Sequence, residues 1–398
     1  MISLISDENR KLLKNRIVQG ILLLYCLLFI YFAVDIIFFT HRGYDKYDGE
    51  FAIFSGLEAI KWEKEQCMPF DGKVLDEDFL AEAEKRFGFQ YDVCSCEIYS
   101  VYNCFIDRTP MGTVYDPVTG TATVGTVIEG FKKIEDVIPA SSVPALYRYS
   151  GGYEVLCQKL SFVGILSVAA SLIISALVFS GEYTAGTDVL LLTSKFGRSR
   201  LAVAKTLSGI IICTGVFLLF SLLTALLCFS FYGFSGADGD IRLSLMRNAD
   251  EITTENLRFF GNAVTNAEFT GFIILVFFSA ILIVSTSALL ISALSHGSFS
   301  ALSITFAVFS FPLAVRAIVH SYEYIVPYSA TDSCFALFPV ILIADWSKTL
   351  WWGISYNIAG ENYPYAVIFP LIALVLSAVF VFLSIFAYGK RRLRCVGV

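Results

Sequence analysis

Residues 269–319 read FTGFIILVFFSAILIVSTSALLISALSHGSFSALSITFAVFSFPLAVRAIV, and Arg316 is the only Asp, Glu, Lys or Arg among them. A helix needs about 20 apolar residues to cross the hydrocarbon core of a bilayer. The stretch is long enough for two such helices, and the Ser-His-Gly-Ser sequence at 295–298 predicts a tight turn between them. We therefore expect antiparallel spans at residues 269–294 and 299–319.

Four further apolar runs of similar length occur in the chain, at residues 17–39, 160–180, 207–232 and 366–389. The whole chain is 56% hydrophobic and 16% charged, whereas soluble domains carry about 25% charged residues. The sequence therefore predicts an all-α polytopic membrane protein with about six transmembrane helices.

Basic residues near the spans predict the orientation, because short loops rich in Lys and Arg stay in the cytoplasm. They gather at residues 10–16, 195–205 and 390–394, and six spans place all three clusters on one side. We expect a multi-pass protein of a cell membrane, and a bacterial one. Both termini should be cytoplasmic, with an amphipathic segment at residues 1–16 and a tail at 390–398.

Residues 40–159 form the long connection between the first two spans and contain 20 Asp and Glu against 12 Lys and Arg. Residues 77–87 have the pattern of an amphipathic helix, and residues 114–128, rich in Thr and Val, that of a β-hairpin. We expect an α+β extracytoplasmic domain here. Its acidic composition argues against a nucleic-acid partner.

Two other external loops are expected, at residues 233–268 and 320–365. Within the second, residues 334–344 and 350–358 are apolar, but polar residues at 345–348 interrupt them. A seventh span would place the basic residues 390–394 outside the cell, against the charge rule. We therefore predict a pair of short re-entrant or interfacial helices, with Trp346, Trp351 and Trp352 at the level of the lipid head groups.

The sequence offers little that is typical of an enzyme. Neither Gly72-Lys73 nor Gly389-Lys390 has the upstream glycine or the following hydroxyl residue of a phosphate-binding P-loop. The three histidines do not form an HExxH pattern, and no GxSxG motif is present. We expect no catalytic residues and no cofactor.

Cysteines are frequent in the expected external domain, where one or two disulfides would stabilise a small fold in an oxidising space. A metal site is the alternative, although Cys-x-Cys without a nearby histidine does not match common zinc spacings; unpaired thiols are the third possibility. The candidates for disulfides are Cys67, Cys94, Cys96 and Cys104.

Two charged residues, Asp35 and Arg316, lie inside the predicted spans. A charge within a membrane is costly unless it is paired or hydrated, so both are candidates for a functional site. Both also lie close to the outer end of their span, where a long side chain can reach water.

Residues 181–200 read GEYTAGTDVLLLTSKFGRSR. They begin acidic, with Glu182 and Asp188, and end basic, which favours a short helix because the charges oppose its macrodipole. The apolar residues 189–192 have no reason to face the cytosol unless they pack on a partner. The loop at 181–206 is therefore predicted to carry a docking surface.

This cytoplasmic segment, placed between the second and third of six spans, resembles the signature of type-two ABC exporter permeases. The large insertion after the first span and the broken apolar hairpin before the last are similar to the subgroup that includes the lipid-exporting A-class transporters and many bacterial permeases. The resemblance implies that the segment is the coupling helix that contacts the ATPase. The resemblance is carried by Glu182, Gly186, Thr187, Leu190, Leu191, Arg200 and Lys205. Asp188 is a further candidate for contact with the ATPase.

The resemblance implies a permease subunit without catalytic activity that couples ATP hydrolysis by a separate chain to the export of a hydrophobic, lipid-like or peptide substrate. Its partners would be two copies of an ABC ATPase, a second permease half in a homo- or heterodimer, and the bilayer. The alternative is a membrane-anchored sensor or scaffold with an external ligand-binding domain. An ion-coupled transporter would need paired acidic residues at the middle of the bilayer, and the sequence has none there.

Overall fold

The computed structural model of the protein describes residues 1–46, 49–87, 91–115, 122–137, 145–187, 200–245, 264–320, 335, 338–344, 355–358 and 361–390. The chain forms two compact units. We call the first, residues 1–32, 156–226 and 271–398, the membrane unit, and the second, residues 33–155 and 227–270, the α+β unit.

Six helices in the described residues are long and apolar enough to span a membrane, which confirms the predicted number. None has an Asp, Glu, Lys or Arg in its central part. The candidate spans are Arg16–Phe39, Gly151–Thr184, Arg200–Tyr232, Asn266–Leu294, Ser298–Val319 and Val367–Gly389.

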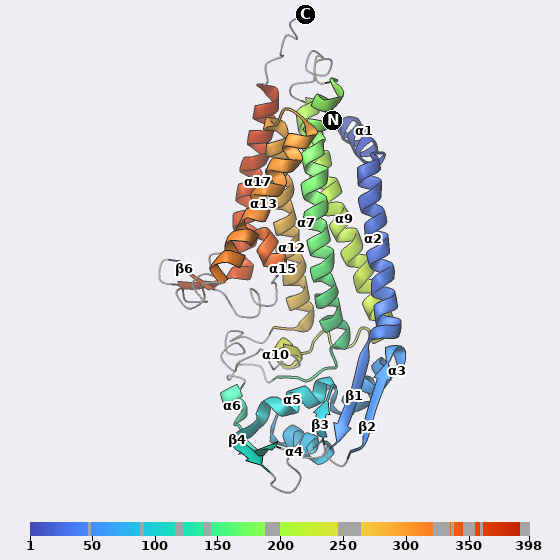
Figure 1. Ribbon diagram of the computed structural model, residues 1–398, viewed down its shortest axis with the longest axis vertical. Coiled ribbons are helices and arrows are strands. Elements are labelled where there is room, and N and C mark those ends of the chain that lie inside the picture. The colour runs from blue at the N-terminus through green and yellow to red at the C-terminus, as the bar shows by residue number, and fades with distance from the viewer. Residues whose placement is uncertain are drawn as a thin grey trace, which may run out of the picture. The chain divides into compact units, whose positions relative to one another are not determined.

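The membrane unit consists mainly of long helices (Figure 1). The first span changes from α-helix to a terminal π-helical turn at Asp35. The turn predicted at residues 295–298 is confirmed, since one helix ends at Leu294 and the next begins at Ser298. The helices are α1 (Ile2–Leu13), α2 (Arg16–Val34), α7 (Gly151–Ala185), α9 (Arg200–Tyr232), α12 (Asn266–Leu294), α13 (Ser298–His320), α15 (Pro339–Ala344) and α17 (Tyr365–Gly389). The π-helical turn η1 (Asp35–Phe39) belongs to the α+β unit.

Small and polar residues allow the helices of the membrane unit to pack closely. A Cβ at Gly209 of α9 would lie 3.1 Å from Leu289 of α12, so glycine permits this approach. The hydroxyl of Ser292 on α12 donates a hydrogen bond to the carbonyl oxygen of Ala176 on α7 (2.6 Å). Such contacts between small residues are the usual means of association between helices in lipid, where apolar burial drives little.

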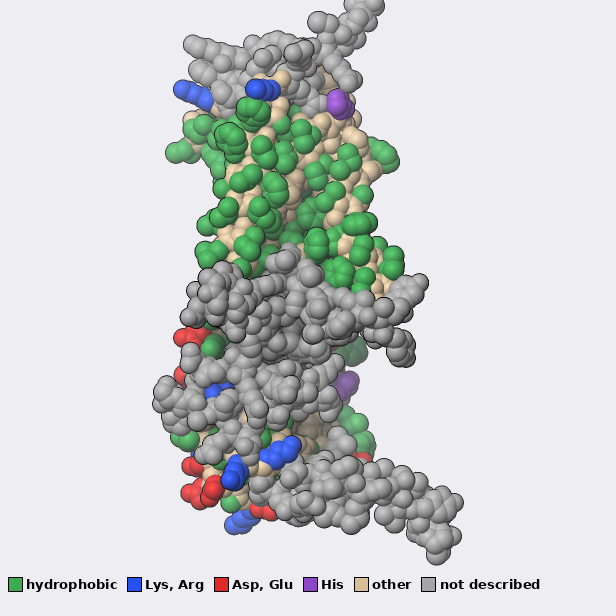
Figure 2. Space-filling view, turned by 90° about the vertical axis from the view of Figure 1, so that its left-hand side faces the viewer, with side chains coloured by type: hydrophobic (Ala, Val, Ile, Leu, Met, Phe, Trp, Pro, Cys, Tyr) green, Lys and Arg blue, Asp and Glu red, His purple; other side chains and the backbone are tan. Residues whose placement is uncertain are grey.

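The outer helices of the membrane unit expose large apolar side chains, including Phe311 and Phe382, which are 68% and 67% exposed. A broad band of hydrophobic side chains covers the helices on the face shown in Figure 2. Apolar surface of this extent needs lipid or another membrane protein as its neighbour.

The α+β unit contains an antiparallel three-stranded sheet with the order β2-β1-β3, in which His41 pairs with Ser55. The predicted helix at 77–87 and the predicted hairpin at 114–128 are both confirmed, as α4 and as β4–β5. Its elements are β1 (His41–Lys46), β2 (Phe51–Ser55), α3 (Gly56–Cys67), η2 (Met68–Phe70), α4 (Glu77–Arg86), β3 (Tyr91–Cys94), α5 (Glu97–Phe105), β4 (Ile106–Tyr115), β5 (Ala122–Phe131), α6 (Ile134–Val137) and α10 (Ile241–Leu245).

Local sequence explains why helix α4 forms. The carboxylate of Asp76 caps its first turn by accepting a hydrogen bond from the backbone N–H of Phe79 (2.8 Å). Acidic residues follow in the first turn and basic residues occupy the last, as the macrodipole favours. Its buried face packs Phe79 against Phe70 and Tyr147 in the aromatic core of the unit.

One prediction about the loop at 320–365 is wrong. Residues 355–358, expected to end a short helix, form strand β6 (Ser355–Ile358), which pairs with β7 (Glu361–Pro364) so that Tyr356 faces Tyr363. Tyr and Ile favour strands, and only two residues separate the paired segments, which suits a hairpin. The other predicted helix is present at Pro339–Ala344, whereas the three tryptophans lie outside the described residues.

Candidate functional site

A buried ion pair joins the helices on either side of the segment at residues 188–199. Glu182 lies in the last turn of α7 and Lys205 in the second turn of α9. Lys205 Nζ lies 2.5 Å from Glu182 Oε1, and the two side chains are only 1% and 5% exposed. Because each charge would be costly to bury alone, this pair fixes the end of α7 against the start of α9.

The N-terminal helix α1 contributes two more charges to the same place. Glu8 Oε2 lies 2.9 Å from Lys205 Nζ, and Lys11 Nζ donates to Glu182 Oε1 at 3.0 Å. Glu8 and Lys11 are three residues apart, so they share one face of α1. The four side chains carry two positive and two negative charges, and their formal charges cancel.

A fourth helix, α17, which is near the C-terminus in sequence, also contacts Glu182. The hydroxyl of Tyr388, near the end of α17, donates to Glu182 Oε2 at 3.5 Å, and its ring lies 4.9 Å from that of Phe179. Helices α1, α7, α9 and α17 thus meet at the end of the membrane unit that carries the N-terminus (Figure 1). We call Glu8, Lys11, Glu182, Lys205 and Tyr388 the ion-pair cluster.

Electrostatics in the ion-pair cluster favour the charged lysine. Burial by itself would lower the pKa of Lys11, but the hydrogen bond to Glu182 and the charges of Glu182 and Glu8 outweigh it, so the pKa is raised. Lys11 therefore stays protonated at any physiological pH. The ion pairs and the hydrogen bond of these five residues connect four helices, an arrangement that suits mechanical connection.

Gly186 and Thr187 end helix α7 in a way that the sequence explains. Gly186 has φ +65°, a left-handed conformation that only glycine adopts cheaply. Its N–H donates to the carbonyl of Tyr183 (3.3 Å), and the N–H of Thr187 donates to that of Glu182 (3.1 Å). These two bonds form a Schellman motif, which stops the helix one turn after Glu182.

The remaining predicted coupling residues are only partly described. Arg200 is the exposed first residue of α9, whereas Asp188, Leu190 and Leu191 lie outside the described residues. The predicted coupling helix therefore stays a prediction. What the structure brings together from the predicted set is Glu182 with Lys205.

Sequence reasoning missed three members of the ion-pair cluster, namely Glu8, Lys11 and Tyr388. Lys11 belongs to the basic cluster at residues 10–16, but that cluster predicted only the orientation of the chain and no contact with Glu182. Glu8 and Lys11 are close in sequence and opposite in charge, yet their partners are more than 170 residues away. No local pattern reveals a contact over such a distance.

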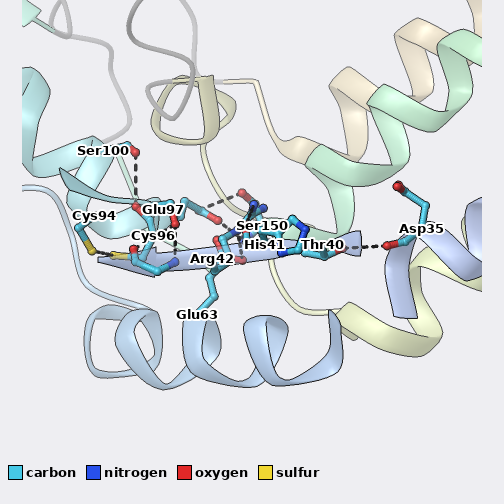
Figure 3. A network of polar contacts seen from close by, with 12 residues as sticks. Asp35, Thr40, His41, Arg42, Glu63, Cys94, Cys96, Glu97, Ser100 and Ser150 are labelled. Carbon is cyan, nitrogen blue, oxygen red and sulfur yellow. Dashed lines mark hydrogen bonds and ion pairs between the residues drawn. The ribbon is translucent and has the colours of Figure 1, made fainter. Parts of the chain in front are cut away.

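The predicted cysteine site lies in the core of the α+β unit. Cys94 Sγ and Cys96 Sγ are 3.4 Å apart and are free thiols (Figure 3). The Arg42–Glu63 ion pair lies next to them. Glu97, also nearby, accepts hydrogen bonds from Ser150. Burial raises the pKa of Cys96, whereas the hydrogen bond between the two thiols lowers that of Cys94.

The other two candidate cysteines are Cys67, which is buried, and Cys104, which is half-buried. Neither is joined in a disulfide in this structure, and the predicted disulfides stay a prediction. Among the described residues, no three His, Cys, Asp or Glu side chains are arranged to hold a metal ion.

The two charges predicted inside spans lie in different units. Asp35 is half-buried in the first turn of η1, where Thr40 Oγ1 donates to its backbone oxygen at 3.5 Å, and belongs to the α+β unit (Figure 3). Arg316 is half-buried in α13 of the membrane unit, four residues before the helix ends at His320. Each lies near an end of its span.

Comparison with known protein families finds a match over most of the chain. The family model described as ABC-2 family transporter protein matches residues 2–325, which include α1, the α+β unit and the first five spans. No curated protein and no solved structure is similar enough to the chain to count as a match.

Proposed function

Because the chain belongs to the ABC-2 transporter family, whose members are membrane permeases of ABC transporters, we propose that it is the permease half of an ABC exporter. A separate ATPase docks on its cytoplasmic segment at 181–206. The observation that carries the proposal is the buried Glu182–Lys205 pair, which ties the helices on both sides of this segment to each other and to α1.

The ion-pair cluster gives such a docking event a rigid target. A force applied by a partner to residues 188–199 reaches α7 and α9 together, because Glu182 and Lys205 hold their ends in contact. Through Glu8, Lys11 and Tyr388 the same force reaches α1 and α17. ATPase closure is then converted into rigid-body movement of the helices, a common form of switching transition.

One chain supplies six spans, so we propose that two permease halves, identical or different, associate with two ATPase subunits. The substrate is hydrophobic, lipid-like or peptidic, because the central parts of the spans offer no charge with which to bind an ionic solute. The α+β unit lies outside the cell, and both termini lie in the cytoplasm.

Co-purification with a candidate ABC ATPase from the same organism tests the proposal. Leu191→Asp places a charge in the proposed contact, where it must be desolvated without a partner, and should reduce both ATPase recovery and substrate-stimulated ATP hydrolysis. Glu84→Lys reverses an exposed charge on α4 and is the matched control. Wild-type recovery and hydrolysis with Leu191→Asp would remove the case for a coupling helix.

Charge exchange at the buried pair tests whether the ion pair itself is required. Glu182→Lys puts a third cation beside Lys11 and Lys205 and should abolish stimulated hydrolysis. The double variant Glu182→Lys/Lys205→Glu restores opposite charges and should recover part of it. A membrane sensor that uses no ATPase would show neither co-purification nor stimulated hydrolysis with any variant, including the wild type.

A further inference from the structure

An open groove of about 740 Å³ runs along one side of helix α3 in the α+β unit. Leu57, Lys61, Lys64 and Met68 recur at intervals of three or four residues and so line one face of the helix. The opposite wall is Phe231, from the last turn of α9. Grooves of this volume are typical of sites for small molecules.

The groove lies where two candidate spans end. Phe231 is the last residue but one of the span Arg200–Tyr232. Helix α3 starts against the end of the first span: the N–H of Gly56 donates to the carbonyl of Thr40 at 2.6 Å, and a Cβ at Gly56 would lie 1.9 Å from the oxygen of Ile37. The groove therefore lies at the boundary between hydrocarbon and water.

Five of the eight residues that line the groove are apolar, the other three being Lys61, Lys64 and Glu65, and the groove is open to its surroundings. Leu57 and Met68 are 49% and 56% exposed, which is unusual for large apolar side chains on a soluble surface but ordinary at the edge of a bilayer. The groove thus offers two apolar side chains and an aromatic ring to a neighbouring hydrocarbon chain.

Two ammonium groups stand in this apolar setting. Lys64 is half-buried; its Nζ donates to the carbonyl oxygen of Phe231 at 3.3 Å, and no carboxylate of the described residues lies within 4.0 Å of it. Lysine has three N–H donors, so two remain for a ligand. Among the described residues, Lys61 forms one ion pair, with Glu65 at 3.9 Å, and both side chains are largely exposed, which makes this pair weak.

We propose that this groove binds one anionic lipid, with its phosphate on Lys64 and Lys61 and an acyl chain against Leu57, Met68 and Phe231. The combination of two cations with an apolar wall fits neither a sugar nor a neutral lipid. The inference requires only that the chain spans a bilayer and does not depend on coupling to an ATPase, so either proposal can fail without the other.

Native mass spectrometry of the full chain in mild detergent tests the proposal, with phosphatidylglycerol and phosphatidylcholine of identical acyl chains as probes. One phosphatidylglycerol should bind more tightly than any phosphatidylcholine. The double variant Lys61→Gln/Lys64→Gln should weaken it about 30-fold, since each basic residue near an anionic surface contributes about 1 kcal/mol. Lys85→Gln, on the exposed face of α4, should leave binding unchanged.

Two further arms identify the ligand chemistry. Met68→Asn should weaken binding of phosphatidylglycerol while both lysines remain. Inorganic phosphate, which has no acyl chain, should not displace the lipid at equal concentration. Equal binding of both lipids, unchanged binding by the double lysine variant or by Met68→Asn, or displacement by phosphate would each overturn the proposal. Unchanged thermal unfolding of the variants shows that the fold is intact.

Discussion

Replacing Lys205 by Met should destabilise the membrane unit more than any surface substitution. The side chain is 1% exposed, and its ammonium neutralises both Glu182 and Glu8. Met has nearly the same length and keeps the packing, so the change removes mainly the charge. Two carboxylates then share one cation, Lys11, whose side chain is 58% exposed.

The size of the effect follows from this geometry. Removing one partner of a buried ion pair costs about 3 to 5 kcal/mol, because the other charge is left without compensation. Lys11 still neutralises Glu182 in part, so we expect the lower limit, about 3 kcal/mol. Glu182→Gln should cost less, about 1 to 2 kcal/mol, since Lys205 keeps Glu8 as its partner and the amide oxygen still accepts a hydrogen bond.

The assay is reversible unfolding of the detergent-solubilised chain by sodium dodecyl sulfate, followed for both single variants and the double variant. The double variant should be at least about 1 kcal/mol more stable than the sum of the single effects predicts, because its two changes remove one interaction. Lys85→Met on α4 is the control and should stay within about 0.5 kcal/mol of wild type. A loss below 0.5 kcal/mol for Lys205→Met would refute the reasoning.

Three other predictions concern the helix end, the orientation and the cysteines. Gly186→Ala should cost about 1 kcal/mol because of its φ of +65°, whereas Gly181→Ala, with equally open space around its Cβ but inside α7, should be neutral or stabilising; equal unfolding midpoints for the two variants would contradict this. Labelling of single-cysteine variants with a membrane-impermeant reagent should reach Thr119 and Asp345 from outside the cell and Ser194 only from inside; labelling of Asp345 from the cytoplasm alone would reject the six-span orientation. Mass spectrometry without reductant should find at least one disulfide, stabilising by about 2 to 4 kcal/mol, and four free thiols would exclude it; the cysteines concerned are Cys67, Cys94, Cys96 and Cys104.

The number of spans was predictable from sequence, because a bilayer imposes a minimum length of apolar helix. The residues at which the helices begin were harder to predict. Helix α7 begins at Gly151, nine residues before the predicted span at 160, and α9 begins at Arg200, seven before 207. Hydropathy detects only the part of a helix that lies in hydrocarbon, whereas backbone hydrogen bonding continues through polar turns such as the one that contains Lys205.

Only those residues of the candidate site that lie in one segment of the sequence were predictable. Glu182 and Lys205 stand in one recognisable segment, but their contact depends on how α7 and α9 return to the same end of the unit. The strand at 355–358 was missed because short apolar segments are ambiguous between helix and strand, and its pairing with residues 361–364 decides the outcome.

The position of α1 in the ion-pair cluster also has a consequence for biosynthesis. Lys11 leaves the ribosome 171 residues before Glu182, its partner. At a synthesis rate of about 5 to 20 residues per second, α1 waits about 9 to 34 s before that carboxylate exists. During this delay an amphipathic helix with basic residues is best held by lipid head groups at the membrane surface. The nascent chain would therefore rest its first helix on the membrane surface and transfer it to protein contacts only after the third span is inserted.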